Sequence, residues 1–275
     1  MDATLHILRR SLITEDDFAR EPTADIIDVM NKRQYFLFYL GCVLFIGAFE
    51  GPSASNINPA RAQKSTKQTE AIALIHDRFL AQYITGDCTD AGQYLVSQTS
   101  DGSWPDIDYA DRSLNWVPQK HLDRLKQMAI AYNNGKSPFI ASILMRDAIA
   151  RGLVFWYRKK PAADDWWHNE IGQQLVLEPI LILMDGAVPG DVVQNGTTYL
   201  HDPVELSSYK VTGQNLIWCA GEQFVRGVLR RSEEDINQAV HAMESVDTLT
   251  ADAEGIQYDH SFHQHGRQLY NGGTD

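Results

Sequence analysis

The sequence predicts an all-α fold of stacked antiparallel helical hairpins, as in an α/α toroid. Apolar residues recur at three- and four-residue spacing in successive segments from about Gln68 onward. Loops rich in Gly, Asn, Asp and Pro separate these segments. No run of alternating polar and apolar residues indicates a sheet of any size. Periodicity alone does not distinguish a toroid from another all-helical array.

The first half of the chain contains three predicted helices. The first spans Thr69 to Thr85 and carries its apolar residues on one face. The second spans Pro118 to Tyr132 and is closed by Asn133-Asn134-Gly135, a strong stop signal. The third spans about Pro138 to Tyr157, and the Lys-Lys-Pro sequence that follows ends it.

Three further helices are predicted in the second half. One runs from about Trp167 to Met184, with a kink expected at Pro179 because proline lacks the N–H that an inner helical position donates. The next two run from Gln214 to Arg231 and from Glu233 to Ser245. Ser232 is the expected N-cap of the last helix.

Composition and charge restrict the class of protein. The chain has 275 residues, of which 44% are hydrophobic and 22% charged, which is typical of a globular protein. The formal net charge of -12 argues against a general nucleic-acid binder, because phosphate contacts need clustered Lys and Arg. It does not exclude a polyanionic sugar, since a local basic groove can lie on an acidic protein.

The N-terminal region resembles an export signal. Met30 to Ser55 contains a basic start, an uncharged apolar run from Tyr35 to Phe49, and then small residues. The run is short for a transmembrane helix, so a cleaved signal is preferred over an anchor. Residues 1–29 carry seven acids and three bases, an unusual start for a signal, so Met30 is the expected true start. A cytoplasmic tail before a signal anchor is the alternative.

The expected organisation is therefore a doubtful extension at 1–29, a signal peptide and spacer at 30–62, and a helical domain at 63–275. Cys42 falls in the segment that we expect to be removed. The spacing of Cys88 and Cys219 fits neither a disulfide-rich scaffold nor a zinc motif. One disulfide and two buried free thiols both remain open, and the thiols are the commoner case.

Four clusters of polar and aromatic residues lie in or near predicted loops. They are Asp101-Gly102-Ser103-Trp104-Pro105-Asp106-Ile107, Trp166-Trp167-His168-Asn169-Glu170-Ile171-Gly172, Thr212-Gly213-Gln214-Asn215, and residues 254–266. Paired tryptophans either bury large areas in a core or form a platform against which sugar rings stack, and composition favours the core.

The histidines of the fourth cluster also allow two interpretations. His260, His263 and His265 lie within six residues, so metal binding has to be considered. No cysteine or carboxylate stands beside them at a helical ligand spacing, and a solvated or hydrogen-bonded histidine is the commoner case. We therefore expect no metal site.

Taken together, the four clusters resemble polysaccharide lyase family 8, the family of chondroitin AC, hyaluronate and xanthan lyases. The resemblance runs from about Asp101 to Gly273 and keeps the four motifs in the family's order, which is more specific than any one motif. The WWHNEIG sequence at 166–172, combined with QHGRQL at 264–269, is most similar to the chondroitin AC lyases.

This resemblance implies an incomplete α/α toroid with a long substrate cleft. It implies that Trp166 and Trp167 belong to an aromatic patch that positions the sugar chain, and that Asn215 contacts the uronate carboxylate. His265 would be the catalytic histidine. The site residues expected on this basis are Asn215 and His265 for catalysis and Trp166, Trp167, Trp104 and Asn169 for substrate binding.

The implied reaction is β-elimination from a uronic acid in an acidic polysaccharide, with chondroitin sulfate or hyaluronan favoured and xanthan-like chains less so. The C5 proton is weakly acidic because the adjacent carboxylate is already negative, so a donor such as Asn215 must stabilise the charge that builds there. His265 could act as the base or could steady the carboxylate. The protein is expected to need no cofactor, to be monomeric, to bind no nucleic acid, to lack a stable membrane span, and to be secreted or periplasmic.

The sequence departs from the family pattern near its end. The family's catalytic tyrosine lies nine residues beyond the histidine, a position that corresponds here to Thr274. Tyr270 is the nearest candidate, at a different offset. We therefore expect a truncated lyase domain with weak activity or none, and poor solubility because apolar helix faces would lack their neighbours.

Three other classes remain as alternatives. The first is a non-catalytic carbohydrate-binding remnant that keeps the aromatic patch and the Asn215 region. The second is a helical interaction protein with no sugar site. The third, and weakest, is a metallohydrolase built on the three neighbouring histidines of residues 260–265.

Overall fold

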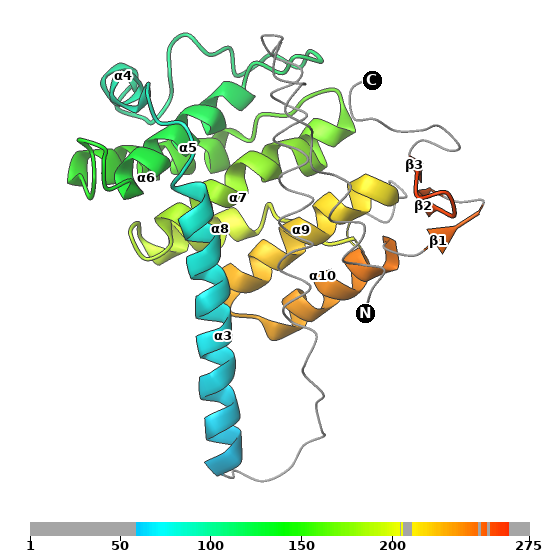
Figure 1. Cartoon of the computed structure of the whole chain (residues 1–275). Coiled ribbons are helices and arrows are strands. Elements are labelled where there is room, and N and C mark those ends of the chain that lie inside the picture. The colour runs from blue at the N-terminus through cyan, green and yellow to red at the C-terminus, as the bar shows by residue number, and fades with distance from the viewer. Residues whose placement is uncertain (1–58, 204, 206–210, 247–248, 252–253, 264–275) are drawn as a thin grey trace, which may run out of the picture.

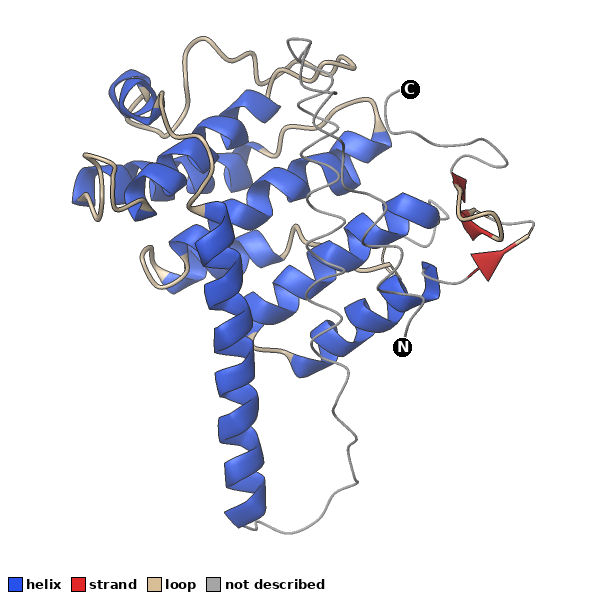
Figure 2. Cartoon of the chain, viewed as in Figure 1, coloured by secondary structure: helices blue, strands red, loops and turns tan. Residues whose placement is uncertain are grey.

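Helices stack side by side to form most of the protein, and a small sheet follows them (Figures 1 and 2). The computed structural model describes residues 59–203, 205, 211–246, 249–251 and 254–263, and for 59–67 only the backbone. The elements in chain order are α3 Pro59–Tyr83, α4 Ala91–Ser97, α5 Gln119–Asn133, α6 Ile143–Lys159, the π-helix η2 His168–Gly172, α7 Gln173–Met184, α8 Gly190–Thr197, α9 Gly213–Arg230, α10 Glu233–Val246, β1 Leu249–Thr250, β2 Gly255–Gln257 and β3 Phe262–His263.

The helices pack in the order α6, α5, α7, α9, α10, so neighbours in the stack are mostly neighbours in sequence. Helix α3 runs across this stack and contacts both α7 and α9 (Figure 1). Helix α7 lies at the centre, and its residues from Leu177 to Met184 are all buried. The predicted all-α class and the hairpin arrangement are therefore confirmed. Within the described part of the chain, no helix combines the length and apolar character that a membrane crossing requires.

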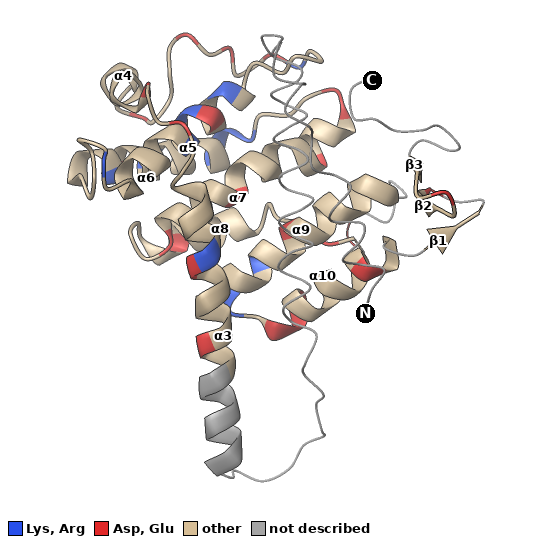
Figure 3. Cartoon of the chain, viewed as in Figure 1, with Lys and Arg blue, Asp and Glu red and all other residues tan. Residues whose placement is uncertain are grey.

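Most predicted helices lie where the periodicity placed them. Helix α5 ends at Asn133, as the Asn-Asn-Gly sequence indicated. Ser232 Oγ accepts a hydrogen bond from the backbone N of Asp235 at 3.2 Å, which confirms the predicted N-cap of α10. The first turn of α10 contains three acidic residues, which the positive end of the helix dipole stabilises (Figure 3). Helix α7 continues through Pro179 to Met184, and the kink stays a prediction.

Four expectations were wrong in detail. Helix α3 begins at Pro59 and not at Thr69. Helix α6 begins at Ile143 and not at Pro138, because Ser142 Oγ accepts from the backbone N of Met145 at 3.4 Å and caps the helix there. The short helices α4 and α8 were not predicted, since seven and eight residues give too little periodicity to detect. A small sheet also follows α10, in which β2 pairs in parallel with β1 and antiparallel with β3.

A buried histidine joins three elements of the first half. His121 on α5 is fully buried, and its Nε2–H donates to the carbonyl oxygen of Gly152 on α6 at 3.0 Å. The hydroxyl of Tyr109 donates to His121 Nδ1 at 2.9 Å and accepts from the backbone N of Trp104 at 3.0 Å. These bonds require the neutral imidazole with its proton on Nε2, because the carbonyl can only accept.

The two thiols are free. Cys88 is partly exposed and Cys219 is buried in α9, where burial raises the pKa of its thiol well above the ordinary value. Of the two alternatives, the structure therefore has free cysteines and no disulfide between Cys88 and Cys219. A buried thiol of raised pKa is an inert packing residue.

Replacing His121 by Gln should remove an acid-sensitive part of the stability. Burial lowers the pKa of His121 from 6.5 to about 4, so on acidification the unfolded chain takes up this proton before the folded chain does. The free energy of unfolding should therefore fall by about 3 kcal/mol between pH 6.5 and pH 4 and level off below that range.

Urea unfolding of the wild type and of His121→Gln at a series of pH values tests this. The difference in stability between the two proteins should shrink as the pH falls through this window. An unchanged difference would show that His121 is not held neutral by the fold.

Candidate functional site

The paired tryptophans lead directly into a turn of π-helix. In η2 the backbone N of Gln173 donates to the carbonyl of His168, five residues earlier. The same spacing places Trp167 over Gly172: a Cβ on Gly172 would lie 2.6 Å from Cζ3 of the indole. Glycine is therefore required here for Trp167 to lie against the helix. Single π-turns inside α-helices are frequently found at functional sites.

A second tryptophan holds this indole from the other side. The rings of Trp167 and Trp218 on α9 meet edge to face, with centroids 5.6 Å apart and an interplanar angle of 70°. Trp218 is buried in a small cluster with Ile171, Leu175 and Cys219, separate from the main core, against which Trp166 and Trp167 pack while partly exposed. The paired tryptophans thus form neither a wholly buried core nor a free surface, but a supported ledge.

The same helix brings Asn215 to this ledge. Asn215 is the third residue of α9 and lies one turn before Trp218, on the same side of the helix. Its side chain is partly exposed, and within the described residues its amide makes no hydrogen bond. A polar amide that no described residue engages, one turn from the Trp218 that supports the ledge, is available to a ligand.

The N-terminus of α9 also contacts the fourth cluster. Gly213 has a φ of 54°, a conformation that glycine adopts without strain and that starts the helix directly after Thr212. The Thr212 hydroxyl donates to the Glu254 carboxylate, which lies just before β2. The Thr-Gly-Gln-Asn and C-terminal motifs, 42 residues apart at this contact, are therefore neighbours in the fold.

Asn169 acts through its contacts with the backbone. Its Oδ1 accepts from the N of Ala163 at 2.8 Å, and its Nδ2 donates to the carbonyl of Ala163 at 3.0 Å. Its own carbonyl accepts from the side chains of Gln173 and Gln174, at 2.6 and 2.8 Å. Asn169 therefore fixes the loop that leads into the paired tryptophans, and its amide is already engaged.

Trp104, which the motif assigned to substrate binding, does not fit that role in this structure. It is 1% exposed, and its Nε1–H donates to the carbonyl of Tyr94 at 3.0 Å. Its ring packs edge to face on His121, with centroids 4.9 Å apart. No face of this indole is open to a sugar, and the motif around it positions α4, α5 and α6 instead.

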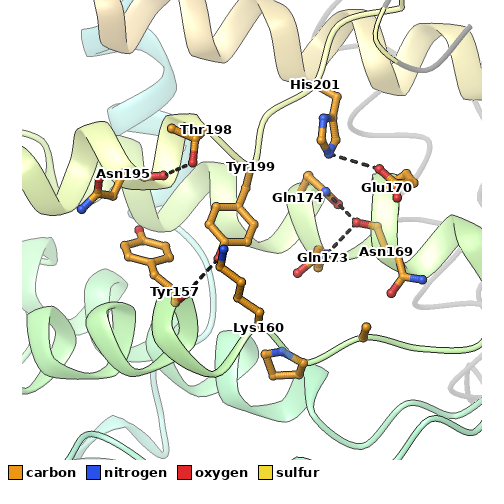
Figure 4. Close-up of a pocket in the computed structure, with 12 residues that line it drawn as sticks. Tyr157, Lys160, Asn169, Glu170, Gln173, Gln174, Asn195, Thr198, Tyr199 and His201 are labelled. Atoms are coloured by element: carbon orange, nitrogen blue, oxygen red, sulfur yellow. Dashed lines mark hydrogen bonds and ion pairs between the residues drawn. The ribbon is translucent and has the colours of Figure 1, made fainter.

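A cavity of about 700 Å³ lies on another side of η2 (Figure 4). Its walls come from the ends of α6 and α8 and from η2, and Trp166 and Trp167 do not line it. His201 and Glu170 face each other in its wall, with His201 Nε2 and Glu170 Oε2 3.2 Å apart. Sequence reasoning placed Glu170 in the second motif without giving it a role, and it missed His201, which lies in an unpatterned loop.

Buried charges hold this part of the wall. Glu222 on α9 is fully buried and its Oε2 accepts from the backbone N of His201 at 3.0 Å. Burial, with the nearby Glu178 carboxyl, raises the pKa of Glu222 well above its ordinary value. Arg226, one turn later, donates to the carboxylates of Asp202 and Asp235 at 3.0 and 3.2 Å. These contacts pin the loop after α8 onto α9.

The remaining candidates lie at or beyond the end of the described chain. His265 and Tyr270 are outside the described residues. His263 lies in β3, and His260 is in the turn before it with a φ of 64°. Among the described residues, no group of three His, Cys, Asp or Glu side chains is arranged to hold a metal ion.

Comparison with known proteins identifies the family. Residues 79–274 match the N-terminal alpha-helical domain of polysaccharide lyase family 8. The chain belongs to this family. This match confirms the resemblance inferred from the four motifs, and the two relatives that follow are lyases by name.

Two curated relatives of this family 8 chain are lyases. The chain is 34% identical over 185 residues to chondroitinase-AC of Pedobacter heparinus, covering 65% of this chain and 26% of that protein. It is 25% identical over 190 residues to a hyaluronate lyase of Thermasporomyces composti, covering 66% of this chain and 24% of that protein. The chain thus spans about a quarter of the length of these relatives.

Solved structures support the same fold. A chondroitinase AC lyase solved with oligosaccharides has a TM-score of 0.66 at 30% identity, over 72% of this chain and 30% of that one. A Paenibacillus xanthan lyase has a TM-score of 0.57 at 20% identity, over 76% of this chain and 21% of that one. The predicted α/α-toroid architecture of the family 8 domain is therefore confirmed.

Replacing Gly172 by Ala should dislodge Trp167. The added methyl cannot fit 2.6 Å from the indole, so the ring must leave Trp218, and overpacking of this kind typically costs about 1–3 kcal/mol. Tryptophan fluorescence and thermal unfolding report the two effects. Gly190→Ala is the matched control, because a Cβ there meets no atom within 4 Å. Equal effects from both substitutions would contradict the packing described here.

Proposed function

We propose that this domain binds uronic-acid polysaccharides and takes part in their β-elimination, with chondroitin sulfate or hyaluronan as substrate. The observation that carries the proposal is the position of Asn215 on α9, one turn before the Trp218 that packs on Trp167, with an amide that makes no hydrogen bond to any described residue. Such a ledge offers flat apolar surface to sugar C–H faces, and the amide offers a hydrogen-bond donor. The names of the two curated relatives agree with these substrates.

The reaction needs charge stabilisation at one carboxylate. A base removes the C5 proton of the uronate, the electron pair forms the C4–C5 double bond, and the glycosidic oxygen leaves C4 and takes up a proton. Negative charge builds on the carboxylate as the C5–H bond breaks. The Asn215 Nδ2–H would donate to that carboxylate, and a fixed donor of this kind typically contributes about 3–4 kcal/mol.

His265 is the proposed base or carboxylate partner. It lies outside the described residues, so the proposal rests on the matching of its motif to the family. Trp166 and Trp167 are proposed to hold neighbouring sugar rings, and Asn169 to position both indoles through the Ala163 backbone. No step requires a cofactor.

The proposed site of action is outside the cytoplasm. The apolar run from Tyr35 to Phe49, with its basic start and small-residue end, has the composition of an export signal. Export would bring the domain to extracellular polysaccharides. We propose cleavage within residues 53–62 and a secreted or periplasmic monomer.

A second candidate is a carbohydrate-binding role without turnover. It requires only the ledge and Asn215, and no base. The ledge and Asn215 would still bind the sugar in that case. Turnover separates the two candidates, because only a lyase forms an unsaturated uronate.

Replacing Asn215 by Ala should lower turnover by about 10²–10³-fold, the usual effect of losing one such donor. The assay follows the ultraviolet absorbance of the conjugated uronate with chondroitin sulfate and with hyaluronan. Asn237→Ala is the matched control, since Asn237 is exposed on α10 away from the ledge. An Asn215→Ala protein as active as this control would refute the assigned role.

Replacing Trp167 by Ala should weaken binding of a chondroitin oligosaccharide about tenfold or more, because the stacking surface and the contact with Trp218 are both lost. Calorimetric titration measures the affinity. Trp104→Phe serves as the control for loss of an indole elsewhere, because Trp104 is buried. Unchanged affinity in Trp167→Ala, from protein shown to be folded, would exclude the ledge as the sugar site.

A further inference from the structure

The cavity beside η2 has no part in the elimination described above. Its volume of about 700 Å³ is within the range of roughly 300–1,000 Å³ that is typical of small-molecule sites. It opens between Tyr157 and Lys160 at the end of α6, Tyr199 after α8, and Glu170 on η2 (Figure 4). Asn169 lines the cavity, whereas Trp166 and Trp167 do not. The Asn169 amide binds the Ala163 backbone in the loop before Trp166, so Asn169 lies between the cavity and the aromatic ledge.

We propose that this cavity is a second carbohydrate site, which binds an uncharged, hydroxyl-rich sugar ring such as an N-acetylhexosamine. The proposal rests on the proposed function, because an acidic glycan with alternating uronate and hexosamine units would supply such a ring. The ledge and Asn215 would take the uronate, and the cavity would take the neutral unit of the same or another chain.

The chemistry of the walls matches a neutral sugar. The side chains of Glu170 and His201 are 23% and 25% exposed, so both can be reached from the cavity and offer a carboxylate acceptor beside an imidazole nitrogen. The rings of Tyr157 and Tyr199 lie 5.4 Å apart at 31°, and the Tyr199 hydroxyl donates to the Tyr157 carbonyl at 3.4 Å. Asn195 adds an exposed amide. Amide, carboxylate and aromatic groups together are suited to hydroxyl-rich rings.

Other ligand classes fit less well. The Glu170 carboxylate would repel an anion such as a uronate or a sulfate. Among the lining residues, Lys160 alone carries a fixed positive charge to offset that repulsion. A metal ion would find one carboxylate and one imidazole there, already paired with each other.

The wall is also fixed in advance of binding. The backbone N of His201 is held by the fully buried Glu222, and the loop around it is held by Arg226 through Asp202. On the same side of the cavity, the Asn169 carbonyl orients the side chains of Gln173 and Gln174 (Figure 4). A site whose walls are already ordered loses less conformational entropy when a ligand binds.

Saturation-transfer NMR on the full chain with the methyl glycoside of N-acetylgalactosamine tests the proposal, with methyl glucuronoside as the comparison. The blocking variant is Asn195→Trp, which places a large ring at the cavity rim from an exposed position. We expect the N-acetylgalactosamine signal to fall about tenfold in Asn195→Trp and to persist in Trp167→Ala. Circular dichroism and thermal unfolding establish that both variants are folded.

Each other outcome overturns the proposal. Loss of the signal in Trp167→Ala with retention in Asn195→Trp would place the sugar on the ledge. A stronger signal from methyl glucuronoside than from N-acetylgalactosamine, blocked by Asn195→Trp, would show a site for anions. Absence of any signal in the folded wild type would exclude a sugar site in the cavity. Because neither monosaccharide can undergo elimination, these outcomes are independent of whether the chain has lyase activity.

Discussion

The contact between Trp167 and Trp218 is the constraint on which the candidate site depends. It joins the start of η2 to α9, and so joins the paired tryptophans to the helix that carries Asn215. The contact exists because the π-turn brings Gly172 beneath Trp167, where no other residue would leave room for the ring. An α-helical turn would put a different residue under the indole, and the ledge would lose its support. The irregular turn therefore defines the geometry of the site.

Buried polar groups support this arrangement from behind. Glu222 and Arg226 lie on α9, one turn apart, and both bind the loop that follows α8. Removing Glu222 would leave the backbone N of His201 without its acceptor, and removing Arg226 would leave the carboxylates of Asp202 and Asp235 without their cation. Unpaired groups of this kind cost far more when they are buried than at the surface. Burial raises the pKa of Glu222, while Arg226 forms ion pairs with Asp202, Glu205 and Asp235. Helix α9 therefore supports both the cavity wall and the ledge.

Helix periodicity was sufficient to predict α5, α7, α9 and α10, because each buries a broad apolar face or, in α7, nearly every residue. The same reasoning could not find η2, since five residues in a π-turn have no periodicity of their own. The sequence contained one signal for this π-turn, the five-residue spacing between Trp167 and the Gly172 that it covers. The motifs located Asn215 and the ledge, but they could not show that Trp104 is packed around the buried His121. His201 and Glu222 were missed because their roles come from contacts between segments far apart in sequence.

We propose that the ledge and Asn215 form one sugar site. A crystal structure of the chain with a chondroitin tetrasaccharide is the most direct test of that site. We expect one sugar ring stacked on Trp166 or Trp167 and a uronate carboxylate within hydrogen-bond distance of Asn215 Nδ2. A tetrasaccharide bound elsewhere, with both indoles and Asn215 free of contact, would contradict the account and leave the family membership without a functional site in this part of the chain.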